Sequence, residues 1–179
     1  VSCLIYLEDK GPIFYTQKRS GLNGKIIKII KFRSMHVDAE IEGIQWSKNN
    51  DKRITRIGRI LRALRIDELP QLFCVLLGSM SLIGPRPERP EIEKKLFKKV
   101  PYYKSRYILK PGISGWAQVN YHYGASVADT KQKLSYDIYY ISNFSFFLDL
   151  LIFFKTIKLV LNAKGYKPKK IIDNNPNTN

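Results

Sequence analysis

The sequence contains few cysteines and no long uncharged hydrophobic run. Its 179 residues include two cysteines, Cys3 and Cys74, which are far apart and lack the spacing of metal ligands. No disulfide framework is therefore expected, which fits a reducing compartment. Cys74 lies in an apolar segment and is expected to be a small buried hydrophobe. Because no run of 18 or more uncharged apolar residues occurs, no membrane-spanning helix is expected in this sequence.

Acidic residues are also scarce relative to basic ones. The chain has 15 aspartate and glutamate residues against 31 lysines and arginines, which gives a formal net charge of +16. This balance indicates an anionic partner. On charge alone, nucleic acid, an anionic membrane surface and phosphorylated substrates all remain possible. The length is sufficient for one domain with a hydrophobic core.

The segments 13–18 and 25–33 predict a β-hairpin. They contain β-branched and aromatic residues, and residues 20–24 between them have the composition of a turn. Lys31 and Arg33 are two residues apart in the second strand, so their side chains should share a face. They are either solvated charges of an edge strand or a clamp for phosphate groups.

Helical patterns occupy much of the remaining chain. An amphipathic helix is expected at 53–65, where arginine recurs at every third position and most of these arginines should contact solvent or lipid headgroups. Residues 87–101 predict an exposed helix of mixed charge, and 127–140 has a helical composition. A phenylalanine-rich helix at 144–161 either covers the core or lies in the headgroup layer of a membrane.

The segments between these helices carry weaker patterns. Residues 36–52 are polar and predict a surface loop or short helix, since their acidic residues match no metal-ligand template. Residues 113–120 predict a short strand or irregular loop, with Trp116 in the core. The expected fold is therefore an α/β (α+β) domain with a small antiparallel hairpin and several amphipathic helices.

Asp67 and Glu68 are adjacent acidic residues in a basic segment. They precede an apolar run of helical spacing formed by Leu69, Leu72, Phe73 and Leu76. We therefore expect Asp67 to be the N-cap of this helix, Pro70 to lie in its first turn and Gly78 to end it. On these residues alone, the plainest interpretation is that the pair caps a helix and complements its dipole.

Arginine residues flank the acidic pair on both sides. Arg62 and Arg65 precede it, and Arg86 follows in a stiff Gly-Pro-Arg-Pro segment. Guanidinium groups and the N–H groups of a helix N-terminus both favour anions. This setting suits a carboxylate that stays ionised and then meets a phosphate, so catalysis is the alternative to capping.

Three sequence blocks carry a resemblance to a known family. They read Asp-Glu-Leu-Pro-Gln-Leu at 67–72, Leu-Ile-Gly-Pro-Arg-Pro at 82–87 and Lys-Pro-Gly-Ile-Ser-Gly-Trp-Ala-Gln-Val-Asn at 110–120. With these blocks in one order, the sequence resembles the bacterial sugar transferases, the monotopic polyprenyl-phosphate phosphoglycosyl transferases. The resemblance extends from about residue 11 to about residue 161.

One stretch departs from the small members of this family, which often continue the third block with Gly-Arg. This chain has Tyr-His-Tyr-Gly-Ala-Ser at 121–126 and there resembles longer members linked to exopolysaccharide synthesis. The departure leaves His122 as a candidate residue, although a lone histidine between tyrosines is more often structural.

The resemblance implies transfer of a sugar-1-phosphate from a UDP-sugar to undecaprenyl phosphate, with release of UMP. Asp67 would be the nucleophile and would form an acyl-phosphate. Lys31 matches the catalytic lysine of the family, and Arg62 matches an active-site arginine. Because phosphate oxygens repel an attacking carboxylate, Lys31, Arg62 and Arg86 would supply fixed cations, and Arg33 is a further candidate phosphate ligand.

A metal ion is implied in the same way. Mg²⁺ held by Asp67 and Glu68 would supply additional positive charge at the phosphates. Glu68 would either bind this metal or move a proton, and the sequence leaves both roles open.

The resemblance also implies domains and a place in the cell. Residues 1–10 would be the remnant of an upstream membrane-inserted helix, 11–163 the catalytic domain, and 164–179 a polar, disordered tail. The domain would be membrane-associated on the cytoplasmic face of a bacterial inner membrane. It would act in the first membrane step of exopolysaccharide, capsule or O-antigen synthesis.

Two other interpretations stay open. A basic, non-catalytic module could bind an anionic membrane or nucleic acid. The sequence has no nucleic-acid-binding motif, however, and paired carboxylates would repel a phosphate backbone, so no nucleic-acid partner is expected. Truncation could also leave a folded but inactive transferase domain. The transferred sugar and the oligomeric state cannot be derived from these patterns.

Overall fold

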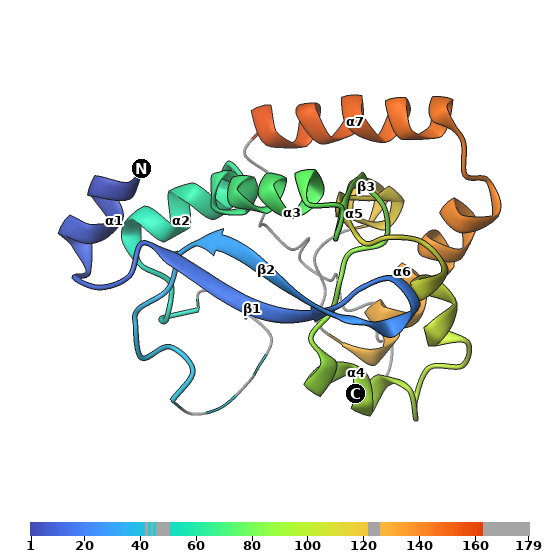
Figure 1. Ribbon diagram of the computed structural model, residues 1–179, viewed down its shortest axis with the longest axis horizontal. Coiled ribbons are helices and arrows are strands. Elements are labelled where there is room, and N and C mark those ends of the chain that lie inside the picture. Colours follow the sequence, from blue (N-terminus) through green and yellow to red (C-terminus); the bar gives the residue numbers. More distant parts are fainter. Residues whose placement is uncertain (42, 44, 46–50, 122–125, 163–179) are drawn as a thin grey trace, which may run out of the picture.

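The computed structural model describes residues 1–41, 43, 45, 51–121 and 126–162. In chain order, the elements that position the site are α1 (Ser2–Glu8), β1 (Phe14–Ser20), η1 (Leu22–Gly24), β2 (Ile26–Phe32), α2 (Arg56–Ala63), η2 (Ile66–Gln71), α3 (Leu72–Leu76), β3 (Ser81–Ile83), α4 (Pro90–Leu96), η3 (Tyr103–Ile108), β4 (Gly112–Ser114), α5 (Trp116–Asn120), α6 (Val127–Ser142) and α7 (Phe146–Leu161). Figure 1 shows the hairpin β1–β2 running through the middle, with α2, α3 and α7 above it and α4 below.

The predicted hairpin is confirmed. Strands β1 and β2 pair antiparallel, with Tyr15 opposite Lys31, and η1 closes the turn. Ile29 of β2 is buried and packs with Cys74 and Met80, so the expected burial of Cys74 is also confirmed. One face of the hairpin is therefore fixed by a hydrophobic cluster, and this fixes the direction of the polar side chains on the strand.

The expected helix at 53–65 is shorter in the structure. Helix α2 begins after Thr55, whose side chain accepts a hydrogen bond from the N–H of Gly58. Arg65 then adopts a left-handed conformation, with φ of 55°, and ends the helical path. Because an L-residue rarely occupies this region, Arg65 marks a sharp change of chain direction directly before the acidic pair.

The expectation that Asp67 caps a helix is wrong. Asp67 lies inside the 3-10 helix η2, whose N-cap is Arg65, and the following helix α3 begins only at Leu72. The left-handed turn at Arg65 starts the helical path before the acidic pair, so the carboxylates fall within it. Gly78, with φ of 76°, follows α3 as expected for a residue that ends a helix.

A second, two-stranded sheet joins the two later sequence blocks. Strands β3 and β4 are parallel, and Gly84 and Gly112 lie against each other. A Cβ atom on Gly112 would lie 2.1 Å from the backbone nitrogen of Gly84, so no side chain fits there. This close approach fixes the start of the segment that carries Arg86.

The region after β4 differs partly from expectation. Residues 113–120 contain the end of a strand and the short helix α5, and Trp116 is only half-buried. Its ring stacks on Tyr139 of α6, and the Lys155 ammonium lies 4.5 Å from the ring centroid. Trp116 thus joins three helices near the surface and is not part of the buried core.

The segment 87–101 was expected to form an exposed helix, but one face of it is buried. Helix α4 is shorter than the predicted element, and Glu93 and Leu96 are buried. Leu96 packs with Val100, Tyr103 and Leu134 in a hydrophobic cluster between α4, η3 and α6. The apolar residues of the segment 87–101 recur at helical spacing, so one stripe of α4 faces the core although the segment is highly charged.

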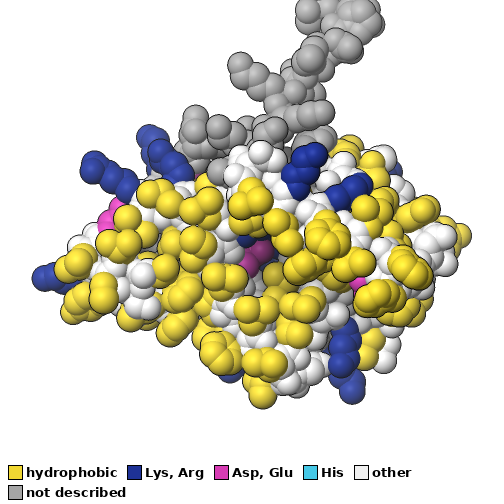
Figure 2. Space-filling view, turned by 90° about the horizontal axis from the view of Figure 1, so that it is seen from above, with side chains coloured by type: hydrophobic (Ala, Val, Ile, Leu, Met, Phe, Trp, Pro, Cys, Tyr) yellow, Lys and Arg dark blue, Asp and Glu magenta, His cyan; other side chains and the backbone are white. Residues whose placement is uncertain are grey.

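Helix α7 confirms the predicted phenylalanine-rich helix, and most of its apolar side chains point away from the core. Ile152 is buried, whereas large apolar residues of α3 and α7 are exposed, namely Phe73, Leu76, Phe146, Phe147, Leu150, Leu151, Phe153, Phe154, Ile157 and Leu161. Figure 2 shows this face covered by apolar side chains, with an acidic group visible in a hollow between them. Such a large apolar surface is typical of an interaction site.

Within the described part of the chain, no helix is both long enough and apolar enough to cross a bilayer.

Candidate active site

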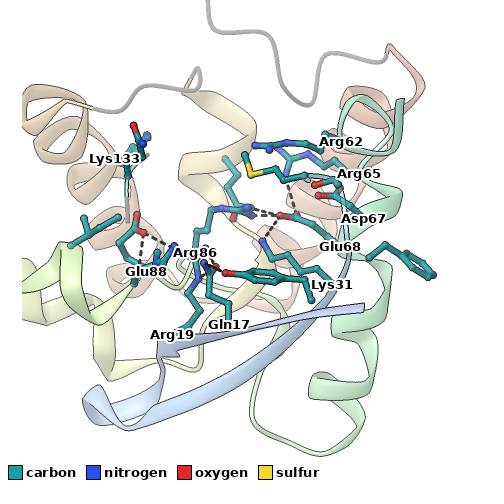
Figure 3. Close-up of a pocket in the computed structure, with 18 of the residues that line it drawn as sticks. Gln17, Arg19, Lys31, Arg62, Arg65, Asp67, Glu68, Arg86, Glu88 and Lys133 are labelled. Atoms are coloured by element: carbon teal, nitrogen blue, oxygen red, sulfur yellow. Dashed lines mark hydrogen bonds and ion pairs between the residues drawn. The ribbon is translucent and has the colours of Figure 1, made fainter. Parts of the chain in front are cut away.

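The polar side chains singled out in the sequence border one cavity of about 670 Å³. The hairpin, η2, the segment after β3, α5 and α6 all contribute to its walls. The lining includes Lys31, Arg33, Arg62, Arg65, Asp67, Glu68 and Arg86. Figure 3 shows side chains from β2, η2 and the segment after β3 pointing toward one another.

Glu68 is the electrostatic centre of this cluster. Lys31 Nζ lies 3.4 Å from Glu68 Oε1, and Arg65 Nη1 lies 3.5 Å from Oε2. Arg86 donates hydrogen bonds to both oxygens, one of them from Nη1 to Oε2 at 3.3 Å. Burial alone would raise the pKa of Glu68, but the charges of Arg86 and Lys31 together with the Arg86 hydrogen bond and Arg65 hold it well below its usual range. Glu68 is therefore ionised at neutral pH and binds three cations from three chain segments.

Asp67 has the opposite electrostatic tendency. Its side chain is also buried, and this burial, together with the negative charge of Glu68, raises its pKa. The charges of Lys31, Arg62 and Arg86 partly oppose the shift. Two adjacent carboxylates thus differ in role: Glu68 is committed to cations, whereas Asp67 is a less stabilised and more basic carboxylate beside them.

Strand β2 of the hairpin positions Lys31, and the pKa of this lysine is lower than that of an exposed lysine. Burial lowers the pKa of Lys31 to about 8, although the nearby charge of Glu68 opposes this change. Desolvation disfavours the ammonium form, so a bound anion would restore the charge that burial removes. The site therefore contains a lysine whose protonation depends on what occupies the cavity.

The structure separates Arg33 from the cluster around Glu68. Strand β2 ends at Phe32, and Arg33 Nη1 lies 3.4 Å from Asp9 Oδ2. Its Nη2 also donates to the backbone carbonyl of Asp9. Arg33 borders the cavity, but its contacts join the hairpin to the segment after α1. Its predicted role as a phosphate ligand stays a prediction.

Sequence reasoning placed Arg65 beside the acidic pair but did not name it as a site residue. Most arginines of the 53–65 series were expected to contact solvent or lipid, but Arg65 lies against Glu68. The helical spacing gave no sign of this contact, because the left-handed turn at Arg65 breaks the assumed periodicity. Its position two residues before Asp67 was the one available signal.

Two predictions lie outside the residues that the structure describes. These are the candidate His122 and the tail at 164–179. The loop expected at 36–52 is described only in part, and its described residues 36–41 include turns.

The acidic residues provide a limited set of donors for Mg²⁺. No group of three or more histidine, cysteine, aspartate or glutamate side chains within the described ranges could hold a metal ion. Mg²⁺ often binds one or two carboxylates together with substrate phosphates and water. Both oxygens of Glu68 already contact cations, whereas Asp67 borders the cavity. The donors therefore fit a metal ion shared between Asp67 and substrate, and Glu68 would have to exchange a cation for the metal.

The family assignment rests on a match over most of the chain. The family model described as bacterial sugar transferase matches residues 1–163. The chain belongs to the bacterial sugar transferase family. All the candidate site residues named above lie within the matched range.

Curated members of the bacterial sugar transferase family are similar over nearly the whole chain. A UDP-N-acetylgalactosamine-undecaprenyl-phosphate N-acetylgalactosaminephosphotransferase of Aeromonas hydrophila is 49% identical over 162 residues, covering 90% of this chain and 38% of the relative. An undecaprenyl-phosphate glucose phosphotransferase of Komagataeibacter xylinus is 42% identical over 164 residues, covering 88% and 31%. An exopolysaccharide production protein of Rhizobium leguminosarum bv. phaseoli is 42% identical over 173 residues, covering 93% and 86%. The chain thus spans about a third of the first two relatives and most of the third.

Proposed function

We propose that this protein transfers a sugar-1-phosphate from a UDP-sugar to undecaprenyl phosphate and releases UMP. The observation that carries the proposal is the cavity with two unlike carboxylates among cations. Glu68 binds Lys31, Arg65 and Arg86, and the adjacent Asp67 has a raised pKa. The names of the relatives, which include two undecaprenyl-phosphate sugar phosphotransferases, support the same reaction.

In the first step, Asp67 acts as the nucleophile. One carboxylate oxygen attacks the phosphorus nearest the sugar, and a new P–O bond forms. The bond from this phosphorus to the bridging oxygen breaks, and its electron pair leaves with UMP. The product is an acyl-phosphate that links the sugar phosphate to Asp67, so a difficult transfer is divided into two easier steps.

In the second step, a phosphate oxygen of undecaprenyl phosphate attacks the same phosphorus. The P–O bond to Asp67 breaks, and the electron pair returns to the carboxylate. The lipid then carries the sugar through a diphosphate, and Asp67 is ready for another cycle.

The cations around Glu68 stabilise the charge that develops on the phosphate oxygens. Lys31 supplies a compact ammonium group, and Arg86 supplies a planar guanidinium that can bind two oxygens. The charge of Arg62 opposes the rise in the pKa of Asp67 and so favours the ionised form of the nucleophile. Glu68 holds Lys31 and Arg86 in place in the absence of substrate, so it orders the cations before the phosphates arrive.

Mg²⁺ is the proposed cofactor. When bound beside Asp67, it would neutralise part of the diphosphate charge and make UMP a better leaving group. Asp67 is the residue best placed to hold it, with Glu68 a second ligand only after it releases a cation.

Membrane association is also part of the proposal. The exposed leucine and phenylalanine side chains of α3 and α7 would contact lipid on the cytoplasmic face of a bacterial inner membrane. The cavity would then receive the lipid acceptor without its leaving the bilayer. A pathway of exopolysaccharide, capsule or O-antigen type would use the product.

The test is incubation of the chain with Mg²⁺, undecaprenyl phosphate and a panel of UDP-sugars, with UMP as the measured product. The panel should include UDP-N-acetylgalactosamine and UDP-glucose, because N-acetylgalactosamine and glucose occur in the names of relatives. We expect UMP release with at least one sugar. Binding of liposomes or nucleic acid without UMP release from any donor would favour the non-catalytic module. UMP release by a chain extended upstream, but not by this chain, would indicate that this chain is an inactive fragment.

A further inference from the structure

Four consecutive backbone carbonyl groups around Arg86 accept hydrogen bonds from four different donors. The pairs are Gly112 N to Pro85 O at 3.0 Å, Arg106 Nη2 to Arg86 O at 2.7 Å, Arg19 Nη1 to Pro87 O at 3.1 Å, and Ser20 N to Glu88 O at 3.0 Å. The donors belong to β1, η3 and β4, which lie far from one another in the sequence. The tertiary structure therefore holds the segment that carries Arg86 at each of the four carbonyl groups of residues 85–88.

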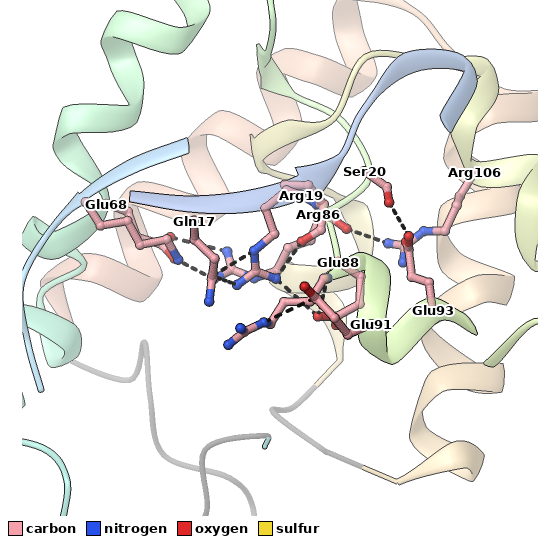
Figure 4. Close-up of polar contacts among 12 residues, drawn as sticks. Gln17, Arg19, Ser20, Glu68, Arg86, Glu88, Glu91, Glu93 and Arg106 are labelled. Atoms are coloured by element: carbon pink, nitrogen blue, oxygen red, sulfur yellow. Dashed lines mark hydrogen bonds and ion pairs between the residues drawn. The ribbon is translucent and has the colours of Figure 1, made fainter. Parts of the chain in front are cut away.

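Two of these donors are guanidinium groups that are largely buried. The exposed fraction of the side chain is 14% for Arg19 and 11% for Arg106. Arg19 also pairs with Glu88, at 3.1 Å, and Arg106 pairs with Asp137, at 2.8 Å. Burying a charge is costly unless it is paired, so the two carboxylates allow these arginines to remain inside. Figure 4 shows Arg19 and Arg106 approaching the segment around Arg86 from two sides.

The chemistry of the segment explains why it needs donors from elsewhere. Proline on each side of Arg86 fixes φ at positions 85 and 87 but supplies no N–H group. The prolines make the segment stiff without fixing where it lies relative to η2. Buried carbonyl groups require partners, and Arg19 and Arg106 provide them while also setting the position of the segment.

The position of this segment matters because Arg86 reaches Glu68 from it. The Arg86 side chain is 39% exposed toward the cavity and contacts both oxygens of Glu68. A guanidinium binds two phosphate oxygens only when its plane is correctly oriented. A small displacement of the Arg86 backbone would therefore weaken its grip on a phosphate while leaving its charge in the cavity.

We propose that Arg19 and Arg106 are positioning residues that aim Arg86 at the reacting phosphate by holding the carbonyl groups of residues 86 and 87. This inference rests on the proposed function for the role of Arg86. Neither arginine touches the acidic pair among the contacts described above. Asp137 and Glu88 act one step further away, by keeping the two buried guanidinium groups charged and oriented.

The first test is hydrogen exchange of the segment 84–89 in the absence of substrate. Arg106→Lys keeps a positive charge opposite Asp137 but loses the planar fork that reaches the Arg86 carbonyl. We expect faster exchange of the amides in this segment. The matched control is Arg59→Lys, the same substitution at an exposed arginine of α2 that does not line the cavity. Exchange in the control should equal that of the unchanged protein.

The second test is a double-mutant cycle for UMP release. We expect Arg106→Lys to lower kcat about tenfold, within the range of measured couplings between contacting residues. In combination with Arg86→Lys, it should lower kcat by less than about a further twofold. The lysine at position 86 has no planar guanidinium, so its contact with phosphate no longer depends on the exact orientation of the backbone. Multiplication of the two single losses would overturn the inference.

The two tests separate this inference from the proposed function. Unchanged exchange in Arg106→Lys overturns the positioning role whatever the enzyme transfers. Faster exchange in a protein that releases no UMP from any donor supports the positioning of the segment and overturns the proposed function instead. If Arg106→Lys fails to fold, Arg19→Lys tests the same idea through the carbonyl of Pro87, with the same expected results.

Discussion

Lys31 of β2 and Glu68 of η2 meet across the cavity, with 3.4 Å between Nζ and Oε1, although 37 residues separate them in the sequence. The contact depends on the register of the hairpin, in which Lys31 lies opposite Tyr15. A shift of one residue would turn Lys31 to the other face of the strand. The buried Ile29 opposes such a shift, so a hydrophobic side chain on β2 maintains the geometry of the contact between Lys31 and Glu68.

The first prediction concerns Asp67, the proposed nucleophile. Asp67→Asn preserves the size of the side chain but removes the attacking oxygen, so UMP release should fall to the background rate. With a UDP-sugar labelled in the phosphate nearest the sugar, the unchanged protein should become labelled without any lipid acceptor, and this label should be removed by hydroxylamine. Asp67→Asn should not become labelled. Mass spectrometry that maps the adduct to another residue would contradict the mechanism.

Glu68→Gln is the comparison within the same pair. It removes the negative charge that holds Lys31 and Arg86 but leaves the proposed nucleophile. Turnover should fall, and labelling of Asp67 should survive at a lower rate. If Glu68→Gln lost turnover and labelling as completely as Asp67→Asn, the covalent chemistry would instead require both carboxylates.

The second prediction is an alkaline limit on activity set by Lys31. Its pKa is lowered to about 8, mainly by burial, so the free protein loses the ammonium charge as pH rises through this value. The kcat/KM for UMP release, which reports groups of the free enzyme, should therefore decrease above about pH 8. The raised pKa of Asp67 predicts a second loss as pH falls, because the nucleophile becomes protonated.

Lys31→Arg separates these two limits. Arginine remains charged throughout the accessible pH range, so the alkaline decrease should disappear while the acidic one remains. An unchanged alkaline decrease in this variant would show that another group titrates there.

The third prediction concerns the shape of Arg86. Arg86→Lys retains the charge near Glu68 but loses the planar fork, so kcat should fall by about tenfold to a hundredfold, less than is typical when a stabilising donor is removed entirely. Arg59→Lys is the matched control, because Arg59 lies on the exposed side of α2 and does not line the cavity. Equal turnover of Arg86→Lys and Arg59→Lys at equal thermal stability would remove Arg86 from the site.

The fourth prediction concerns membrane binding. We expect part of the protein to remain on anionic liposomes at high salt and to leave with detergent, because salt screens charges but not apolar contacts. Leu76 and Leu77 are 81% and 84% exposed, so replacing both with serine should reduce the salt-resistant fraction, at about 2 kcal/mol for each leucine that enters lipid.

The matched control for this experiment is Tyr102→Ser. Tyr102 is 82% exposed and lies between α4 and η3, away from α3 and α7 in the sequence. Its replacement should leave liposome binding unchanged. Complete release of the unchanged protein by salt alone would indicate a purely electrostatic module.

Local patterns in the sequence were sufficient for several elements. β-branched, aromatic and turn residues predicted the hairpin, helical spacing predicted α2, and composition predicted α6 and α7. These elements follow from interactions between residues close in the chain, which composition and periodicity record. The same reasoning failed at Asp67, because a single left-handed residue, Arg65, moved the start of the helical path.

The sequence by itself determined the acidic pair, the surplus of cations and, through three ordered blocks, the family. The tertiary structure alone decided which cations reach which carboxylate. It placed Arg65 on Glu68, directed Arg33 to Asp9 and brought Arg106 to the carbonyl of Arg86. These contacts join residues on separate elements, and their geometry depends on the packing of β2, η2, η3 and α6. Periodicity within one element contains no information on such distances, so the opposite pKa shifts of Asp67 and Glu68 follow only from the folded chain.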